Sequence, residues 1–171
     1  MQTSDYLDQK KSEIEQALQM HFDAHFKETS VLNRAIKYSV LNGGKRIRPI
    51  LCLATAESCK GTKQDTLPAA LAVELFHCST LIHDDLPCMD DDDLRRGRPT
   101  CHIQFGEANA VLAGDALIIE AFKLLAIENC AQQAAELAQA AGAGGVIAGQ
   151  VADLAAEHMT PSKELVDYIH Y

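Results

Sequence analysis

The stretch of sequence that decides the fold is LPAALAVELFHCSTLIHDDL, residues 67–86. It is long and largely apolar, a pattern that predicts a buried helix. Pro87 comes directly after it, and proline interrupts the hydrogen-bond ladder of a helix and disfavours helical dihedrals in the residue before it. The segment therefore predicts a core helix whose loosened end delivers a dense group of aspartates.

The composition of the whole chain extends this prediction to an all-α protein. The 171 residues are 47% hydrophobic but only 5% aromatic, with no tryptophan, and alanine and leucine recur throughout. This usage favours packed helices over a sheet, and the length fits a single domain over residues 1–171. Gly43 and Gly44 end one predicted helix, and Pro49 suits the first turn of the next. The other expected helices cover residues 4–26, 31–41, 50–59, 108–127 and 131–156, and Pro161 starts a last piece.

Charge and cysteine content restrict the class of protein further. The net charge of −9 argues against nucleic acid as a partner, and no stretch approaches the roughly 20 apolar residues of a membrane span. The polar N-terminus has no signal-peptide core, so we expect a cytoplasmic protein. The six cysteines form no C-x-x-C pair, which indicates reduced, mostly buried thiols.

The aspartates after the core helix are candidate metal ligands. Asp84 and Asp85 end the helix, and a loosened turn at Leu86-Pro87 can bring Asp90 back toward them. Converging carboxylates without nearby His or Cys suit Mg²⁺, which bridges a few carboxylates to phosphate oxygens. A calcium loop fits less well, because its glycine and spaced aspartates are missing.

Two basic segments are candidate anion sites. Arg95, Arg96 and Arg98 follow the aspartates and can bind phosphate through planar guanidinium groups. In GGKRIRP, residues 43–49, the cations Lys45, Arg46 and Arg48 precede a helix N-terminus, which also favours anions. His77 lies two turns before Asp84 on the same helical face and can donate to a phosphate.

Each of these features has a simpler interpretation when taken alone. An aspartate run is most often a solvated loop, GGKRIRP can be a helix cap followed by surface charges, and a single histidine is usually structural. Their occurrence together is what favours a site for a metal-bound diphosphate.

Three segments together resemble one known family. GGKRIRP (43–49), LIHDDLPCMDDDDLRRGRPT (81–100) and FGEANAVLAGDAL (105–117) are similar to the polyprenyl synthetase family of trans-isoprenyl diphosphate synthases, most closely to its bacterial farnesyl diphosphate synthases. The resemblance implies an all-α isoprenoid synthase bundle around a central cavity, a homodimer, and head-to-tail condensation of isopentenyl diphosphate with an allylic diphosphate.

The resemblance also implies roles for individual residues. It makes Asp84, Asp85 and Asp90 the ligands of Mg²⁺, with three ions in each active site and Mn²⁺ as a substitute. It assigns Arg95 to the allylic diphosphate. It assigns Lys45, Arg48, His77 and Arg96 to isopentenyl diphosphate, and Gln150 and Asp153 to the cavity wall.

Two departures from the family pattern leave alternatives open. The family's second aspartate-rich motif does not occur before Tyr171, so the chain resembles the N-terminal part of the family, and a non-catalytic subunit is an alternative to an active synthase. Ser79 and Thr80 are small where the family often has bulk at the cavity floor, which favours geranylgeranyl diphosphate or a longer product over farnesyl diphosphate. A terpene cyclase fits worst, because it needs no site for isopentenyl diphosphate.

Overall fold

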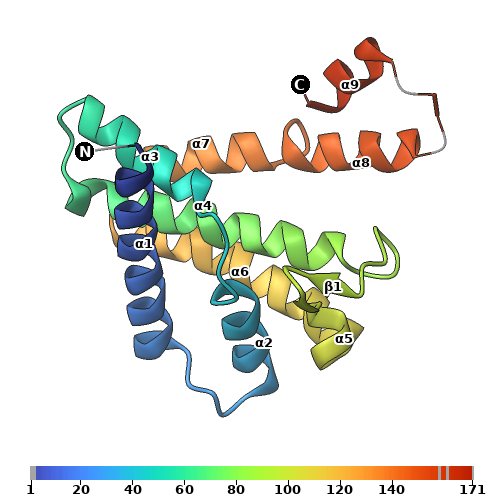
Figure 1. Ribbon diagram of the computed structural model, residues 1–171, viewed down its shortest axis with the longest axis horizontal. Helices are drawn as coiled ribbons and strands as arrows, with labels where there is room; N and C mark the ends of the chain where they lie inside the picture. The colour runs from blue at the N-terminus through green and yellow to red at the C-terminus, as the bar shows by residue number, and fades with distance from the viewer. Residues whose placement is uncertain (1–2, 158, 161, 171) are drawn as a thin grey trace. The chain divides into compact units, whose positions relative to one another are not determined.

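The computed structural model describes residues 3–157, 159–160 and 162–170 (Figure 1). The chain forms two compact units, Met1–Asn129 and Cys130–Tyr171, which we call the first and the second unit. Whether both belong to one domain, as the sequence predicts, stays a prediction. Pro161, the predicted start of the last piece, lies outside the described residues.

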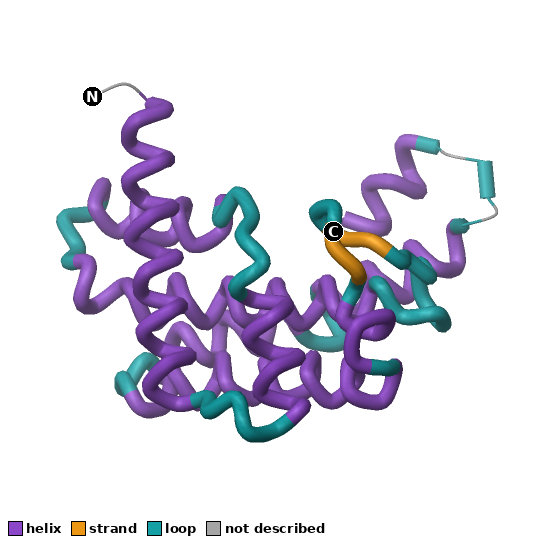
Figure 2. Tube along the Cα trace, turned by 60° about the horizontal axis from the view of Figure 1, so that its bottom comes forward, coloured by secondary structure: helices purple, strands orange, loops and turns teal. Residues whose placement is uncertain are grey.

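The first unit is a helical assembly with one short hairpin, which stands out in orange in Figure 2. The prediction of an all-α fold is therefore confirmed. The helices of this unit are α1 (Thr3–His25), α2 (Val31–Val40), α3 (Ile47–Ser58), α4 (Lys63–Asp84), α5 (Cys101–Phe105) and α6 (Glu107–Ile127), and its strands are β1 (Leu94–Arg95) and β2 (Arg98–Pro99).

The core of the first unit is the packing of α4 against α6, the most extensive contact between any two elements (Figure 1). Small residues on α6 allow the two helices to approach closely. At Gly114 a Cβ atom would lie only 2.1 Å from Nε2 of His83 on α4. The fully or nearly fully buried apolar residues of the two helices include Leu71, Leu75, Ile82, Ala113, Leu117 and Ala121.

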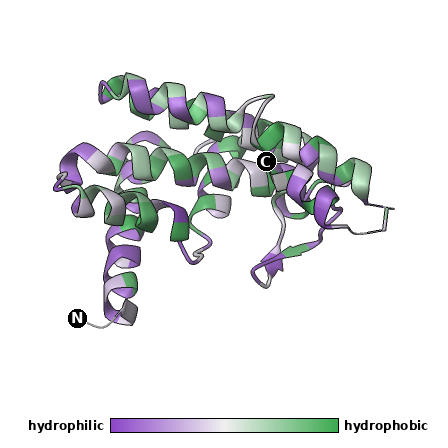
Figure 3. Cartoon of the chain, turned by 90° about the horizontal axis from the view of Figure 1, so that it is seen from above, coloured by the Kyte–Doolittle hydropathy of each residue, from purple (hydrophilic) through white to green (hydrophobic). Residues whose placement is uncertain are grey.

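Helix α1 follows the amphipathic pattern of its sequence, and Figure 3 shows its hydrophilic and hydrophobic colours alternating. Ile14, Leu18 and Phe22, spaced four residues apart, are fully buried. Leu7, which belongs to the same pattern, remains 38% exposed, so burial of this stripe is complete only along the second half of the helix.

Two helices begin earlier than the sequence suggests, and local capping explains the earlier start of one of them. Helix α4 begins at Lys63 because the hydroxyl of Thr62 accepts a hydrogen bond from the backbone N–H of Asp65, at 3.3 Å. Pro68 is tolerated inside the helix, where it is buried. Helix α3 begins at Ile47, which places Pro49 in its first turn as predicted.

The second unit contains α7 (Ala131–Ala141), α8 (Val146–Ala156) and α9 (Lys163–His170). The prediction of one helix over residues 131–156 is wrong, because the chain leaves the helical conformation between α7 and α8. Gly142 caps α7 with extended dihedrals, φ −72° and ψ −165°. Three glycines within residues 142–145 make helical continuation costly.

No helix in the described ranges is both long and apolar enough to cross a bilayer.

The close contact at Gly114 yields a test of the α4–α6 packing. Gly114→Ala should destabilise the protein by about 1–2 kcal/mol, because the new methyl group displaces His83 from its contact with the Val111 carbonyl. In a His83→Ala background the same substitution should instead stabilise by about 0.5–1 kcal/mol, the ordinary gain of alanine over glycine in a helix. Urea unfolding of the four proteins measures both effects. An equal effect in both backgrounds would contradict the packing argument.

Candidate diphosphate site

The end of α4 folds back on itself and brings two aspartates together. The helix ends at Asp84, and the backbone N–H of Asp90 donates to the carbonyl of Asp84 at 2.9 Å. This return is the geometry that the Leu86-Pro87 step suggests. Burial raises the pKa of Asp84 above its ordinary value, and the nearby negative charge of Asp90 raises it further.

Asp85 takes a different direction from its two neighbours. Its side chain is only 3% exposed and accepts from Nε of Arg95 at 2.7 Å, with Nη2 of Arg95 2.5 Å from the same oxygen. This hydrogen bonding raises the pKa of Arg95. The predicted ligand Asp85 therefore holds an arginine, while Asp84 and Asp90 remain as the converging pair.

The donor set at this turn fits a hard divalent cation. In residues 3–157, 159–160 and 162–170, no three His, Cys, Asp or Glu side chains lie close enough to hold a metal ion by themselves. Mg²⁺ commonly takes one or two protein carboxylates and completes its shell with water and substrate phosphates. Burial is the main cause of the raised pKa of Asp84, and the negative charge of Asp90 adds a repulsion that a bound cation would relieve.

A two-stranded hairpin that the sequence analysis missed carries the three arginines. Strands β1 and β2 pair antiparallel, with Arg95 opposite Arg98. Arg96 and Gly97 form the turn with φ of 54° and 75°, so both residues are left-handed, as a tight hairpin turn requires. Gly97 after Arg96 was the available signal, but strands of two residues leave no alternating pattern to read.

The hairpin is fastened to α2. The hydroxyl of Tyr38 donates to the Pro99 carbonyl at 2.7 Å, and the Arg98 guanidinium lies 4.6 Å from the centre of the Tyr38 ring. Arg98 also donates to Oδ1 of Asn42 at 3.0 Å. The Arg98 side chain thus holds the hairpin in place in this structure, and its contact with phosphate stays a prediction.

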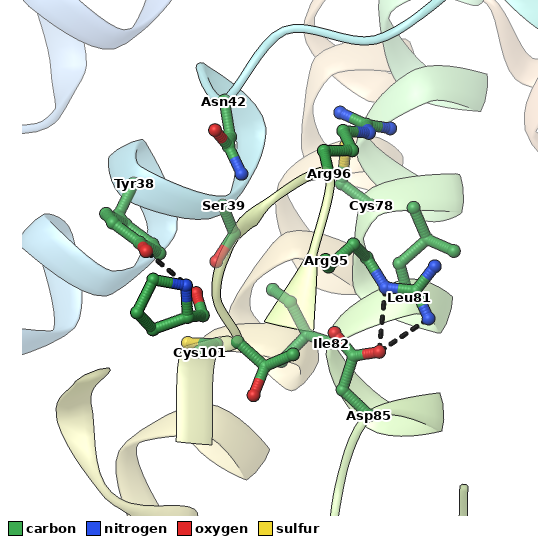
Figure 4. Close-up of a pocket in the computed structure, with 12 residues that line it drawn as sticks. Tyr38, Ser39, Asn42, Cys78, Leu81, Ile82, Asp85, Arg95, Arg96 and Cys101 are labelled. Atoms are coloured by element: carbon green, nitrogen blue, oxygen red, sulfur yellow. Dashed lines mark hydrogen bonds and ion pairs between the residues drawn. The ribbon is translucent and has the colours of Figure 1, made fainter. Parts of the chain in front are cut away.

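The two remaining arginines point in different directions, as Figure 4 shows. Arg95 reaches Asp85 beside a small cavity of about 30 Å³, whereas Arg96 points away from Asp85. Nη1 of Arg96 donates to the carbonyl of Gly43. A Cβ at Gly44 would lie 2.7 Å from the same nitrogen, so the glycine is needed for this approach.

Beyond Arg96 lies a larger opening that we call the basic cavity. Its volume is about 580 Å³. Four predicted residues for isopentenyl diphosphate meet there, and the N-terminus of α3 adds backbone N–H groups. The charged and titratable residues that line it are Lys11, Lys45, Arg46, Arg48, Glu74, His77 and Arg96.

His77 is a neutral member of this set. Its Nε2 lies 3.4 Å from Nη1 of Arg48. Burial lowers the pKa of His77, and the positive charge of Arg48 lowers it further. A neutral imidazole with a depressed pKa can donate one hydrogen bond to an anion in the basic cavity.

Arg46 differs from Lys45 and Arg48 because it is bonded within the protein. It is 2% exposed, and it donates to Glu74 at 2.6 Å, Glu15 at 2.9 Å and the Val40 carbonyl at 2.7 Å. Burial alone would lower the pKa of Arg46, but its hydrogen bonds to the two glutamates outweigh burial and raise it. Arg46 thus fixes the loop before α3, whereas Lys45 and Arg48 stay the predicted anion ligands of this segment.

The two residues expected to set product length lie on α4. Ser79 is fully buried and its hydroxyl donates to the Phe76 carbonyl at 2.6 Å. Thr80 is half-buried, donates to the His77 carbonyl at 2.8 Å, and lies one turn before Asp84 on the same face. Neither lines the two cavities described above.

Gln150 and Asp153 lie on α8 in the second unit. Both line a hollow of about 460 Å³ within that unit, together with Gly149 and Ile169. Their predicted place in the wall of the active site stays a prediction.

Comparisons with known proteins show the family to which the chain belongs. The sequence profile of the polyprenyl synthetase family matches residues 29–171, and the chain belongs to that family. It is 44% identical to geranylgeranyl pyrophosphate synthase 11, chloroplastic, of Arabidopsis thaliana, over 96% of this chain and 49% of that protein. It is 43% identical to farnesyl diphosphate synthase of Bacillus subtilis, over 96% of this chain and 58% of that protein.

A solved structure supports the same fold. The geranyltransferase from Legionella pneumophila superimposes with a TM-score of 0.91 and 34% identity, over 97% of this chain and 61% of that chain. The predicted isoprenoid synthase fold is thereby confirmed. The chain spans about half the length of the plant relative and somewhat more of the bacterial proteins.

The buried network at Arg46 yields a second test. Glu74→Gln should cost about 3 kcal/mol in the free energy of unfolding, because it leaves the Arg46 charge buried with a weakened set of partners. The double variant Arg46→Met/Glu74→Leu should recover most of this loss. Glu28→Gln, which breaks an exposed pair with Lys37, is the matched control and should have no measurable effect. Chemical denaturation compares them, and equal losses at Glu74 and Glu28 would contradict a structural role for the network.

Proposed function

We propose that this protein is a short-chain trans-prenyltransferase that joins isopentenyl diphosphate head to tail to an allylic diphosphate. The observation that carries the proposal is the position of the β1–β2 hairpin. Arg95 adjoins the aspartate turn on one side, and the next residue, Arg96, lines the basic cavity on the other. An enzyme that joins two diphosphate substrates needs two anion sites side by side. Arg95 and Arg96, successive residues of one hairpin, would each serve one of these sites.

The aspartate turn would hold the allylic diphosphate. Asp84 and Asp90 would bind Mg²⁺, and Arg95, which binds Asp85 with one edge of its guanidinium, has Nη1 on another edge for a phosphate oxygen. Bound Mg²⁺ would supply positive charge for the diphosphate as it departs. Mn²⁺ as a substitute and three ions in each site remain part of the proposal.

The basic cavity would hold isopentenyl diphosphate. Lys45, Arg48 and Arg96 provide positive charge, and His77 provides a neutral donor. The allylic C–O bond breaks, the double bond of isopentenyl diphosphate attacks the resulting carbocation, and a proton is lost to the released diphosphate. A longer prenyl diphosphate, inorganic diphosphate and one proton result, without a protein nucleophile.

The test is a product assay with Mg²⁺, isopentenyl diphosphate and geranyl diphosphate, read by mass spectrometry. Asp84→Ala should lower turnover by about 10²–10³-fold, because charge on the departing diphosphate loses its support. Chelation of divalent ions should abolish product, and added Mg²⁺ should restore it. Asp8→Ala, on an exposed position of α1, is the matched control and should leave turnover unchanged.

Two outcomes would overturn the proposal. A folded Asp84→Ala protein with full turnover would remove the metal assignment. A folded wild-type chain that binds neither diphosphate in the presence of Mg²⁺ would remove the function as a whole.

Product length has two candidates. Farnesyl diphosphate is our first proposal, and the small side chains at Ser79 and Thr80 favour geranylgeranyl diphosphate as the second. The plant relative's name specifies a geranylgeranyl product and the Bacillus relative's name a farnesyl product. A cytoplasmic location and a homodimer stay predictions.

The positions of these two side chains sharpen the test of product length. Thr80→Tyr should shorten the product by one isoprene unit, because Thr80 lies on the face of Asp84 and is accessible. Ser79→Tyr should mainly lower the melting temperature, because Ser79 is fully buried. Mass spectrometry of the products and thermal unfolding distinguish the two variants. Unchanged product from Thr80→Tyr would exclude Thr80 from the cavity floor.

A further inference from the structure

One cation of the basic cavity comes from a helix that none of the family motifs covers. Lys11 of α1 is half-buried and lines the cavity together with Lys45, Arg48 and His77. The motifs that predicted the other cations lie in residues 43–49 and 81–100. Lys11 therefore reaches the same opening from a separate part of the sequence.

The neighbouring lysine shows that this placement is specific. Nζ of Lys10 lies 2.5 Å from Oε1 of Glu57 and 3.6 Å from Glu13, so its charge is balanced within the protein. Lys11 points to another side of α1 and makes no hydrogen bond or ion pair with any described residue. The ammonium group of a half-buried lysine that has no carboxylate partner is stabilised when an anionic ligand binds beside it.

The position of Lys11 relative to the cavity is fixed by the buried network. Glu15, one turn further along the same face of α1, accepts from Nε of Arg46 at 2.9 Å. Glu74, the only carboxylate among the described residues that line the cavity, is 2.6 Å from Nη1 of Arg46. Arg46 thus anchors α1 beside the loop and also neutralises Glu74, so the charge left for a ligand is positive.

We propose that Lys11 is a further diphosphate-binding residue, through which α1 contributes directly to the site for isopentenyl diphosphate. The inference rests on the proposed function of the basic cavity. Lys11 adds a third direction of contact, because Lys45 and Arg48 approach from the loop before α3 and from the first turn of that helix, and Arg96 approaches from the hairpin. A diphosphate bound there is enclosed by three separate elements of the first unit.

The experiment measures the Kd of the full chain for isopentenyl diphosphate, and separately for inorganic pyrophosphate, by isothermal titration calorimetry. Lys11→Ala should weaken binding of both ligands about fivefold, the effect of one partly exposed charge pair. Lys11→Glu should weaken it further, and Lys11→Arg should retain affinity. Lys27→Ala removes the same charge at an exposed position outside the cavity and should leave Kd within about twofold of wild type.

Arg48→Ala separates failure of this inference from failure of the proposed function. If Arg48→Ala weakens binding but Lys11→Ala matches Lys27→Ala, the cavity binds diphosphate without Lys11 and the inference is overturned. If neither Arg48→Ala nor Lys11→Ala changes the Kd of a wild type that binds, the ligand lies elsewhere and both proposals fall. Thermal unfolding curves that overlay with wild type confirm that each variant is folded. Affinity that falls in the order Arg, Ala, Glu at position 11 supports a direct charge contact with the ligand. A purely structural role of Lys11 would not produce this order.

Discussion

The ion pair between Asp85 and Arg95 is the constraint on which the rest of the site depends. A carboxylate that is 3% exposed is stable only with its charge compensated, and Arg95 supplies two contacts to one oxygen. The pair ties the end of α4 to the hairpin. Because the hairpin then has a fixed position, Arg96 is directed to the opposite side and reaches the loop before α3. One partly buried pair thus orders the residues of both proposed anion sites.

Charged residues in this structure divide into those that hold the framework and those left for a ligand. Asp85, Arg46 and Arg98 are bonded to side chains within the protein, whereas Lys11, Lys45 and Arg48 line the basic cavity without a carboxylate partner among the described residues. Removing a charge that holds the framework costs much folding stability, because its charged partner then remains buried without compensation. Ligand-facing charges are expected to be dispensable for folding, so stability and binding can be changed separately in this protein.

The sequence predicted most helices of the first unit well, because they follow from local patterns. Hydrophobic periodicity and capping residues identify α1, α2 and α6 to within a few residues. The division between framework and ligand charges could not be predicted, since it depends on contacts such as Arg46 with Glu74, 28 residues apart. Lys11 was missed for the same reason. A lysine on a polar helix face has no local signal that distinguishes a cavity from solvent.

The contacts of the hairpin with α2 also bear on how the site forms during folding. Tyr38 and Pro99 are separated by 61 residues, and Arg96 and Gly43 by 53. Closing loops of this size costs entropy before the contacts form, so non-local contacts are slow to appear in comparison with helices. A chain that has formed α2, α3 and α4 but has not closed the hairpin has its aspartates and its basic loop in separate regions. The two proposed diphosphate sites therefore come together only when the first unit completes its folding.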